Sequence, residues 1–200
     1  CVLNADDASY AFLARYCRAP IITYGIDNPG ADVNARHLDL RAQGSAFVVS
    51  LPDGEDLSVE TPLVGRFNVA NCLAAIATAW SQGVAPADVA RALATFAGVP
   101  GRMERIDAGQ DFAVIVDYAH TAESLRQVLT VLRPLTSGHL IAVYGSAGDR
   151  DRTKRPEMGA VAAELADWSV ITDEDPRTED AATILREIAV GAEQRGAVMG

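Results

Sequence analysis

The stretch Val114-Ile115-Val116-Asp117-Tyr118-Ala119-His120-Thr121 is an apolar run of strand length that ends abruptly at polar residues, and a helical pattern follows it. The stretch 144–156, which reads YGSAGDRDRTKRP, ends a second apolar run in the same way. In a parallel α/β sheet this transition marks the carboxyl end of a strand, where ligands bind. Two neighbouring strands are therefore expected to deliver charged side chains to one crevice, which favours an anionic substrate. These side chains are Asp117, His120, Asp149, Arg150, Lys154 and Arg155.

Strands and helices alternate around these two stretches. Strands are expected at about 112–116, 139–144 and 168–172, and helices at about 121–134, 156–166 and 180–195. The helices carry apolar residues at helical spacing, such as Leu125, Val128, Leu129 and Leu132. Because the strands are almost continuously apolar, we predict parallel pairing with right-handed crossovers. The fold class is α/β, with a Rossmann-like second half built on a parallel sheet.

Short apolar runs and turn residues alternate over residues 1–63. Residues 21–25 and 46–50 are predicted strands, and residues 51–55 form a hairpin turn. After Gly65 the spacing of apolar residues becomes helical, and two successive helices are predicted, each with one apolar face. In the first helix this face contains Leu73, Ile76, Ala77 and Trp80. In the second, which begins near Pro86, it contains Val89, Leu93 and Phe96. Glycines and a proline at 98–101 predict a linker between two domains, 1–98 and 99–200.

The composition excludes several classes of protein. A formal charge of −10 argues against general affinity for nucleic acid. With 49% apolar residues, a chain of this length can form a hydrophobic core. Three widely spaced cysteines favour reduced thiols, hence a cytoplasmic location. No membrane-spanning run or signal peptide is visible. Since residues 1–7 resemble the end of a strand, the chain is expected to begin within a domain.

Asn68 and Asn71 lie three residues apart near the start of the first helix, so they share one face. One of them could cap the helix, because asparagine is a preferred capping residue. Two asparagines exceed what one cap requires, and an amide also suits the edge of a purine. Both interpretations remain open at this point.

The strand-end residues also allow two interpretations each. Asp117 either accepts a hydrogen bond from a ribose hydroxyl, with His120 beside it, or interacts with the dipole of the next helix. The loop at 145–156 either brings glycine backbone and basic side chains to an anion or is a solvated charged loop. The sequence contains no Ser-His-Asp set, zinc-ligand spacing or reactive cysteine environment, so no catalytic residue or metal ligand is assigned.

Two further arginines are candidates for ligand binding. Arg102, in the linker, reaches phosphates across a cleft or forms a surface ion pair. Arg177 follows Glu174 and Asp175 after the third strand of the second half. Together these three residues can hold both ends of an amino acid, or Asp175 and Pro176 simply open a turn.

Several spaced motifs, in this order, resemble those of the Mur ligase family, and most closely its tripeptide synthetases. They are residues 4–7 (NADD), 65–71 (GRFNVAN), 98–104 (GVPGRME), 117–121 (DYAHT), 145–156 and 175–180 (DPRTED). The resemblance runs almost end to end. It implies a three-domain cytoplasmic ligase, of which this chain holds the back of the central ATPase domain and the front of the C-terminal domain.

The resemblance also implies a reaction and a set of roles. Such enzymes use Mg²⁺ and ATP to convert a carboxylate of a UDP-linked muramyl dipeptide into an acyl phosphate, which a diamino acid then attacks. Asn68 and Asn71 would face adenine, Arg102 the phosphates, and Asp117 the ribose, with His120 close by. The amino-acid and phosphate cleft would be lined by Arg150, Lys154 and Arg155 and, around the added amino acid, by Glu174, Asp175 and Arg177.

The chain departs from the family pattern in two respects. The phosphate loop, magnesium ligands and carbamylated lysine, and a later Lys-Gly-His-Glu segment, are absent from these 200 residues. Diaminopimelate-adding members usually carry Asp-Asn-Pro-Arg where this chain has Glu174-Asp175-Pro176-Arg177. We favour meso-diaminopimelate over lysine as the added amino acid. The alternatives are a folylpolyglutamate- or cyanophycin-type amide ligase, or a non-catalytic binding fragment, and the 200 residues alone are expected to be inactive.

Overall fold

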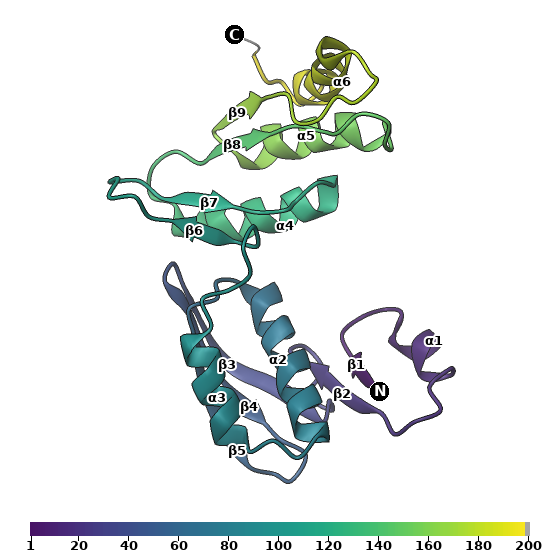
Figure 1. The fold of residues 1–200 in the computed structure, drawn as a ribbon, viewed down its shortest axis with the longest axis vertical. Coiled ribbons are helices and arrows are strands. Elements are labelled where there is room, and N and C mark those ends of the chain that lie inside the picture. The colour runs from purple at the N-terminus through teal and green to yellow at the C-terminus, as the bar shows by residue number, and fades with distance from the viewer. Residues whose placement is uncertain (199–200) are drawn as a thin grey trace. The chain divides into compact units, whose positions relative to one another are not determined.

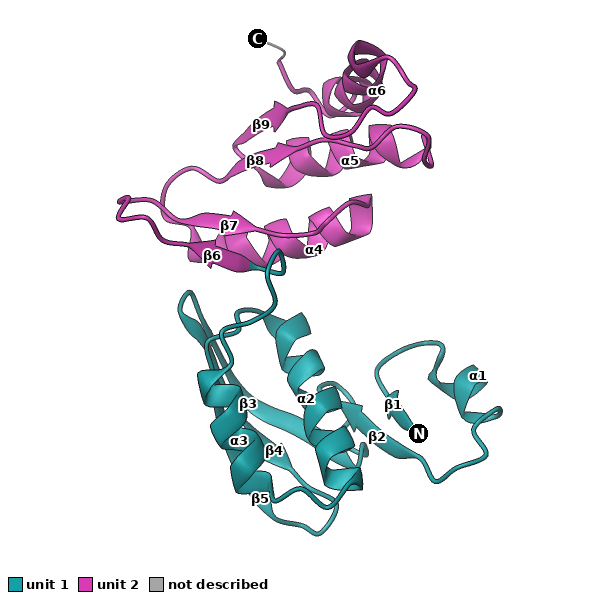
Figure 2. Cartoon of the chain, in the orientation of Figure 1, with its two compact units in different colours: residues 1–103 teal, residues 104–200 magenta. Residues whose placement is uncertain are grey.

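The computed structural model describes residues 1–198 and divides into two compact units, Cys1–Met103 and Glu104–Gly200 (Figures 1 and 2). The division follows Met103, whereas the predicted boundary followed residue 98. The backbone between these points turns repeatedly, with left-handed φ values at Gly98, Gly101 and Met103. No helix within residues 1–198 has the length and apolarity needed to span a membrane.

Unit 1 is a five-stranded sheet with two long helices packed on it (Figure 1). The sheet order follows the chain: β1 (Val2–Asn4), β2 (Ile22–Gly25), β3 (Val33–Arg41), β4 (Gly44–Ser50) and β5 (Asp56–Thr61). The helices are α1 (Tyr10–Ala14), α2 (Arg66–Ser81) and α3 (Pro86–Thr95). The first three strands pair in parallel, and β3, β4 and β5 pair antiparallel.

Alternation along the strands builds the core of unit 1. Val33, Phe47 and Val59 are buried, and the inner face of α2 covers them with residues such as Leu73 and Ile76. The alternation breaks at His37, whose φ of 53° accompanies a register shift against β4. A bulge of this kind re-aims the residues that follow it.

Several expectations for this half are confirmed: the strands near 21–25 and 46–50, the turn between β4 and β5, and Pro86 at the start of α3. The inward placement of Phe96 is wrong. This residue has an extended backbone after the end of α3, and 44% of it is exposed. β3 and α1 were not predicted.

Within residues 104–198, unit 2 contains two separate pairs of strands and three α-helices. The strands are β6 (Glu104–Ile106), β7 (Val114–Val116), β8 (Ile141–Tyr144) and β9 (Trp168–Ile171). The helices are α4 (Ala122–Leu132), α5 (Lys154–Leu165) and α6 (Ala181–Glu193), with a 3₁₀ turn, η1 (Arg133–Leu135). β6 and β7 pair antiparallel, β8 and β9 pair in parallel, and α5 packs on both α4 and α6.

Close contact between α5 and α6 depends on two glycines. A Cβ atom at Gly159 would lie 2.0 Å from the Ile188 carbonyl oxygen, and one at Gly191 would lie 1.7 Å from the Pro156 carbonyl oxygen. No side chain fits at either position without moving the helices apart. The two glycines therefore set the separation of the helices.

The predicted strands and helices of unit 2 are confirmed, with ends that differ by up to two residues, and so is the parallel pairing of β8 with β9. Only one face of β8 is buried. Ala142 and Tyr144 are buried, but Ile141 and Val143 on the other face are more than half exposed. β6 was not predicted, because its three residues carry no visible alternation.

Candidate functional site

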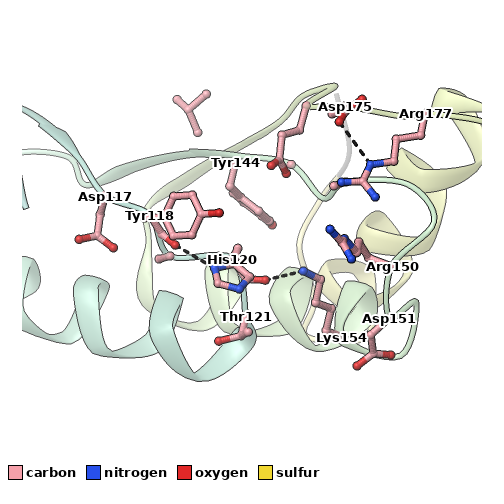
Figure 3. Close-up of a pocket in the computed structure, with 15 residues that line it drawn as sticks. Asp117, Tyr118, His120, Thr121, Tyr144, Arg150, Asp151, Lys154, Asp175 and Arg177 are labelled. Atoms are coloured by element: carbon pink, nitrogen blue, oxygen red, sulfur yellow. Dashed lines mark hydrogen bonds and ion pairs between the residues drawn. The ribbon is translucent and has the colours of Figure 1, made fainter. Parts of the chain in front are cut away.

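A cavity of about 780 Å³ lies in unit 2 (Figure 3). Three segments line it: the residues after β7, the residues after β8 with the first turn of α5, and the residues after β9. Seven of the predicted site residues line this cavity. They are Asp117, His120, Arg150, Lys154, Glu174, Asp175 and Arg177. Strand ends therefore converge as predicted, although β7 and β8 are not hydrogen-bonded neighbours within residues 1–198.

The segment after β7 is held by local contacts. Nδ1 of His120 lies 3.0 Å from the carbonyl oxygen of Tyr118, and the two rings meet edge-on at 5.1 Å. A carbonyl only accepts, so Nδ1 carries the proton in this bond. Thr121 then caps α4, with reciprocal hydrogen bonds to Ser124. Asp117 is thus presented by a well-anchored turn.

Cationic groups gather at one end of the cavity and Asp117 lies at the other (Figure 3). Lys154 Nζ donates to the His120 carbonyl oxygen at 2.6 Å, so the first turn of α5 is tied to the segment after β7. Arg177 Nε donates to Asp175 Oδ2 at 3.4 Å, and both side chains remain more than one-third exposed. With Arg150, they create a site that can pair both anionic and cationic groups of a ligand.

The loop after β8 (residues 145–153) and the loop after β9 (residues 172–180) are joined to each other. Gly148 N donates to the Asp175 carbonyl oxygen at 2.8 Å, and a Cβ at Gly148 would lie 1.9 Å from the Pro176 carbonyl oxygen. The Asp149 carboxylate accepts from Thr178, whose Oγ1 lies 2.8 Å from Oδ1. Asp149 has a φ of 52°, a strained value for a residue other than glycine.

The structure corrects the prediction for Arg155. Its side chain is fully buried and does not line the cavity. Both terminal nitrogens bind Glu179, at 2.8 and 2.9 Å, and Nη1 also binds Glu187 at 2.6 Å. The guanidinium is therefore neutralised within unit 2 by carboxylates that follow β9, and Arg155 is a structural residue. Arg152, which also pairs with Glu187, supports the same cluster.

Glu179 is the centre of this cluster, in which only Arg155 is fully buried. Hydrogen bonds from Arg155 and from the backbone N–H of Asp149 lower its pKa from the ordinary 4.5 to about 2. Hydrogen bonds from Arg152 and Arg155 also lower the pKa of Glu187. Glu179 was not predicted as part of the site, although it lies within the motif at 175–180 that contains Arg177.

We predict that the stability deficit of Glu179→Gln depends on pH. A folded-state pKa below the ordinary value means that the glutamate stabilises the fold above about pH 4.5, and that this contribution is lost as pH falls towards about 2. The difference in melting temperature between wild type and variant should be full above about pH 5 and shrink as pH falls to about 3. Glu157→Gln, an exposed change on α5, serves as the control. A difference that stays constant with pH would contradict the prediction.

The remaining predicted residues lie in unit 1. Neither Asn68 nor Asn71 caps α2, because the N-cap is Gly65, with a φ of 96°. Asn68 Nδ2 donates to the Val64 carbonyl oxygen at 2.9 Å, and Asn71 Nδ2 donates to Asn68 Oδ1 at 3.2 Å. The two amides form a connected pair on one helix face. Arg102 is exposed in the turn near the end of the unit.

The described residues contain no cluster of three or more His, Cys, Asp or Glu side chains that could hold a metal ion. No role in metal binding is assigned to these residues.

Comparison with protein families gives two matches that follow one another along the chain. Residues 1–79 match the Mur ligase middle domain, and residues 101–199 match the Mur ligase glutamate ligase domain.

Curated relatives match most of the chain. A UDP-N-acetylmuramoyl-L-alanyl-D-glutamate–2,6-diaminopimelate ligase of Solibacter usitatus is 45% identical over 95% of this chain and 38% of its own length. A UDP-N-acetylmuramyl-tripeptide synthetase of a Roseiflexus species is 45% identical over 100% of this chain and 39% of its own. The chain thus spans about two-fifths of the length of these relatives.

Two solved structures are also similar to this chain. A structure of a UDP-N-acetylmuramoyl-L-alanyl-D-glutamate–2,6-diaminopimelate ligase is 36% identical, covers 94% of this chain and 39% of that chain, and has a TM-score of 0.62. A MurF structure from Acinetobacter baumannii is 25% identical, covers 95% and 41%, and has a TM-score of 0.74.

Proposed function

This chain belongs to the Mur ligase family, and from that premise we propose that it acts as part of a cytoplasmic, ATP-dependent amide ligase of peptidoglycan synthesis. The ligase adds a diamino acid to UDP-N-acetylmuramoyl-L-alanyl-D-glutamate. ATP transfers its γ-phosphoryl group to a carboxylate of the UDP-linked peptide, which yields ADP and an acyl phosphate. The amine of the diamino acid attacks the acyl carbon, an amide forms, and phosphate leaves.

One observation carries this proposal: Arg150, Lys154 and Arg177 line the same cavity as Glu174 and Asp175. A diamino acid has at least one carboxylate and two amines, so it needs both signs of charge in its site. A guanidinium binds a carboxylate through two parallel hydrogen bonds, and the acids accept from ammonium groups. Arg177 is assigned to a carboxylate of the added amino acid, and Glu174 and Asp175 to its distal ammonium.

The added amino acid in this proposal is meso-diaminopimelate rather than lysine. Diaminopimelate carries a second carboxylate at its distal end, which gives Arg177 a partner that lysine lacks. Two of the relatives described above are named for diaminopimelate, which supports the same choice. Asp175 occupies the position at which diaminopimelate-adding members usually carry an asparagine. Its carboxylate only accepts hydrogen bonds, whereas the amide of an asparagine can also donate them.

ATP and Mg²⁺ are the cofactors that the family implies. Asp117 is proposed to accept a hydrogen bond from the ribose, beside His120, and Asn68 and Asn71 to meet the adenine edge. Arg102 is proposed to pair with phosphate. The metal neutralises phosphate charge when it is bound, and its ligands are not assigned within residues 1–198.

The proposed function is tested with the full-length ligase. ATP, the UDP-linked dipeptide and meso-diaminopimelate should give ADP, phosphate and the tripeptide in equal amounts, with lysine and ornithine as competitors. The 200-residue chain alone should show no ATP turnover, because it lacks the phosphate loop. Formation of AMP and pyrophosphate would exclude the acyl-phosphate route, and preferred use of lysine would exclude the choice of diaminopimelate.

We predict that Asp117→Ala in the full-length ligase raises the KM for ATP by about ten- to a hundredfold. One hydrogen bond to a charged group contributes about 1.5–3 kcal/mol. Asp117 is half-buried at the rim of the cavity, so the fold should remain intact. Steady-state kinetics with a melting curve measures both effects, and Asp111→Ala, an exposed change, is the control. An unchanged KM for ATP would assign Asp117 to the helix dipole instead.

A further inference from the structure

Arg177 reaches the cavity from a backbone conformation that its own sequence does not favour. Its φ is 50°, in the left-handed region that residues other than glycine and asparagine rarely adopt. Such a conformation persists only where the surroundings hold it. If the contacts that hold it were lost, the loop would relax to a more favourable backbone conformation and the guanidinium of Arg177 would leave its position at the cavity.

Several of the hydrogen bonds that hold this loop lead to a single carboxylate. Glu179 Oε1 accepts from Asp149 N at 2.7 Å, and the Asp149 carboxylate in turn accepts from Thr178, next to Arg177. The other side of Glu179 is fixed by both terminal nitrogens of the buried Arg155. From its place in the loop after β9, Glu179 thus connects that loop both to the first turn of α5 and to the loop after β8.

We propose that Glu179 is a positioning residue, which holds Arg177 in the orientation that binds the added amino acid. This rests on the proposed function, because the ligand of Arg177 is part of it. Glu179 does not line the cavity, so any effect on the substrate must pass through the loops. A misplacement of about 1 Å is enough to lower activity by about a hundredfold at a site of this kind.

The chain offers a matched control in Glu187. This residue lies on α6 and also binds Arg155 and Arg152, the second of which is in the loop after β8, but within residues 1–198 it has no hydrogen bond to Asp149 or to the loop after β9. Glu179→Gln and Glu187→Gln each remove one carboxylate charge from the same guanidinium. Only Glu179→Gln also weakens the connection to Asp149. The pair separates positioning from general loss of stability.

The test measures kinetics of the full-length ligase with both variants, alone and combined with Arg177→Ala. Glu179→Gln should raise the KM for the diamino acid by about tenfold or more, and leave the KM for ATP within about twofold. Glu187→Gln should leave both KM values within about twofold despite its lower melting temperature. In the Arg177→Ala background, Glu179→Gln should have almost no additional effect, because the residue through which it acts is gone. Equal effects of the two glutamine variants, or additive effects with Arg177→Ala, would overturn the proposal.

A readout without substrate keeps this proposal distinct from the proposed function. Trypsin should cleave the bond after Arg177 faster in Glu179→Gln than in wild type or Glu187→Gln, whatever amino acid the ligase uses. If Glu179→Gln fails to fold, Thr178→Val takes its place, since it removes the bond to Asp149 at an exposed position. Unchanged cleavage in the folded variant would overturn the positioning role even if the ligase activity is as proposed.

Discussion

Replacing Arg177 by alanine in the full-length ligase is expected to raise the KM for the diamino acid by about a hundredfold and to leave the KM for ATP nearly unchanged. Two parallel hydrogen bonds between a guanidinium and a carboxylate contribute about 3 kcal/mol, which corresponds to that factor. The side chain is 37% exposed, so its loss removes little packing and the melting temperature should hold. Steady-state kinetics with each substrate varied in turn measures the split.

Arg177→Lys is the matched variant for this prediction. An ammonium keeps the charge but lacks the planar pair of donors, so it should restore only part of the affinity. Full rescue by lysine would mean that Arg177 supplies charge alone. A KM for the diamino acid that scarcely changes in Arg177→Ala would show that another residue binds the carboxylate.

Replacing Arg155 by methionine is expected to lower the free energy of unfolding of unit 2 by about 3 kcal/mol, because removal of one member of a buried ion cluster leaves its partners uncompensated. Methionine has a similar length and fills the space, so the loss reports charge rather than a cavity. Glu179 and Glu187 remain partly exposed, which allows water to reach them and places the effect at the low end of the usual range. In a domain of this size, such a loss corresponds to roughly 10–20 °C in melting temperature.

Arg152→Met is the control for this prediction, because Arg152 binds Glu187 from a more exposed position. Its ion pair is accessible to solvent and should contribute less than about 1 kcal/mol. Thermal and urea unfolding of both variants measures the difference. Equal losses for the two arginines would mean that burial of Arg155 has no energetic consequence.

The sequence alone determined the elements that carry strong local signals. Alternation, helical spacing and turn residues located β2, β4, β7, β8, β9 and the five long helices within a few residues. Pro86 and Thr121 marked helix starts through their own chemistry, since proline has no N–H and a threonine hydroxyl accepts from the first turn. The order of motifs also identified the family, which the family models confirm.

Only the tertiary structure decided what each charged residue does. Arg150, Lys154 and Arg155 look alike in a basic run, but one turn of α5 directs Lys154 to the cavity and Arg155 into the interior. The burial of Arg155 depends on the face of α5 on which it lies and on its bonds to Glu179 and Glu187. These glutamates lie 24 and 32 positions further along the chain, so no local sequence pattern contains them. The left-handed conformations of Asp149 and Arg177 likewise depend on contacts between two loops. Local propensity fixes secondary structure because its causes lie within a few residues, whereas the role of a charge depends on partners that only folding brings near.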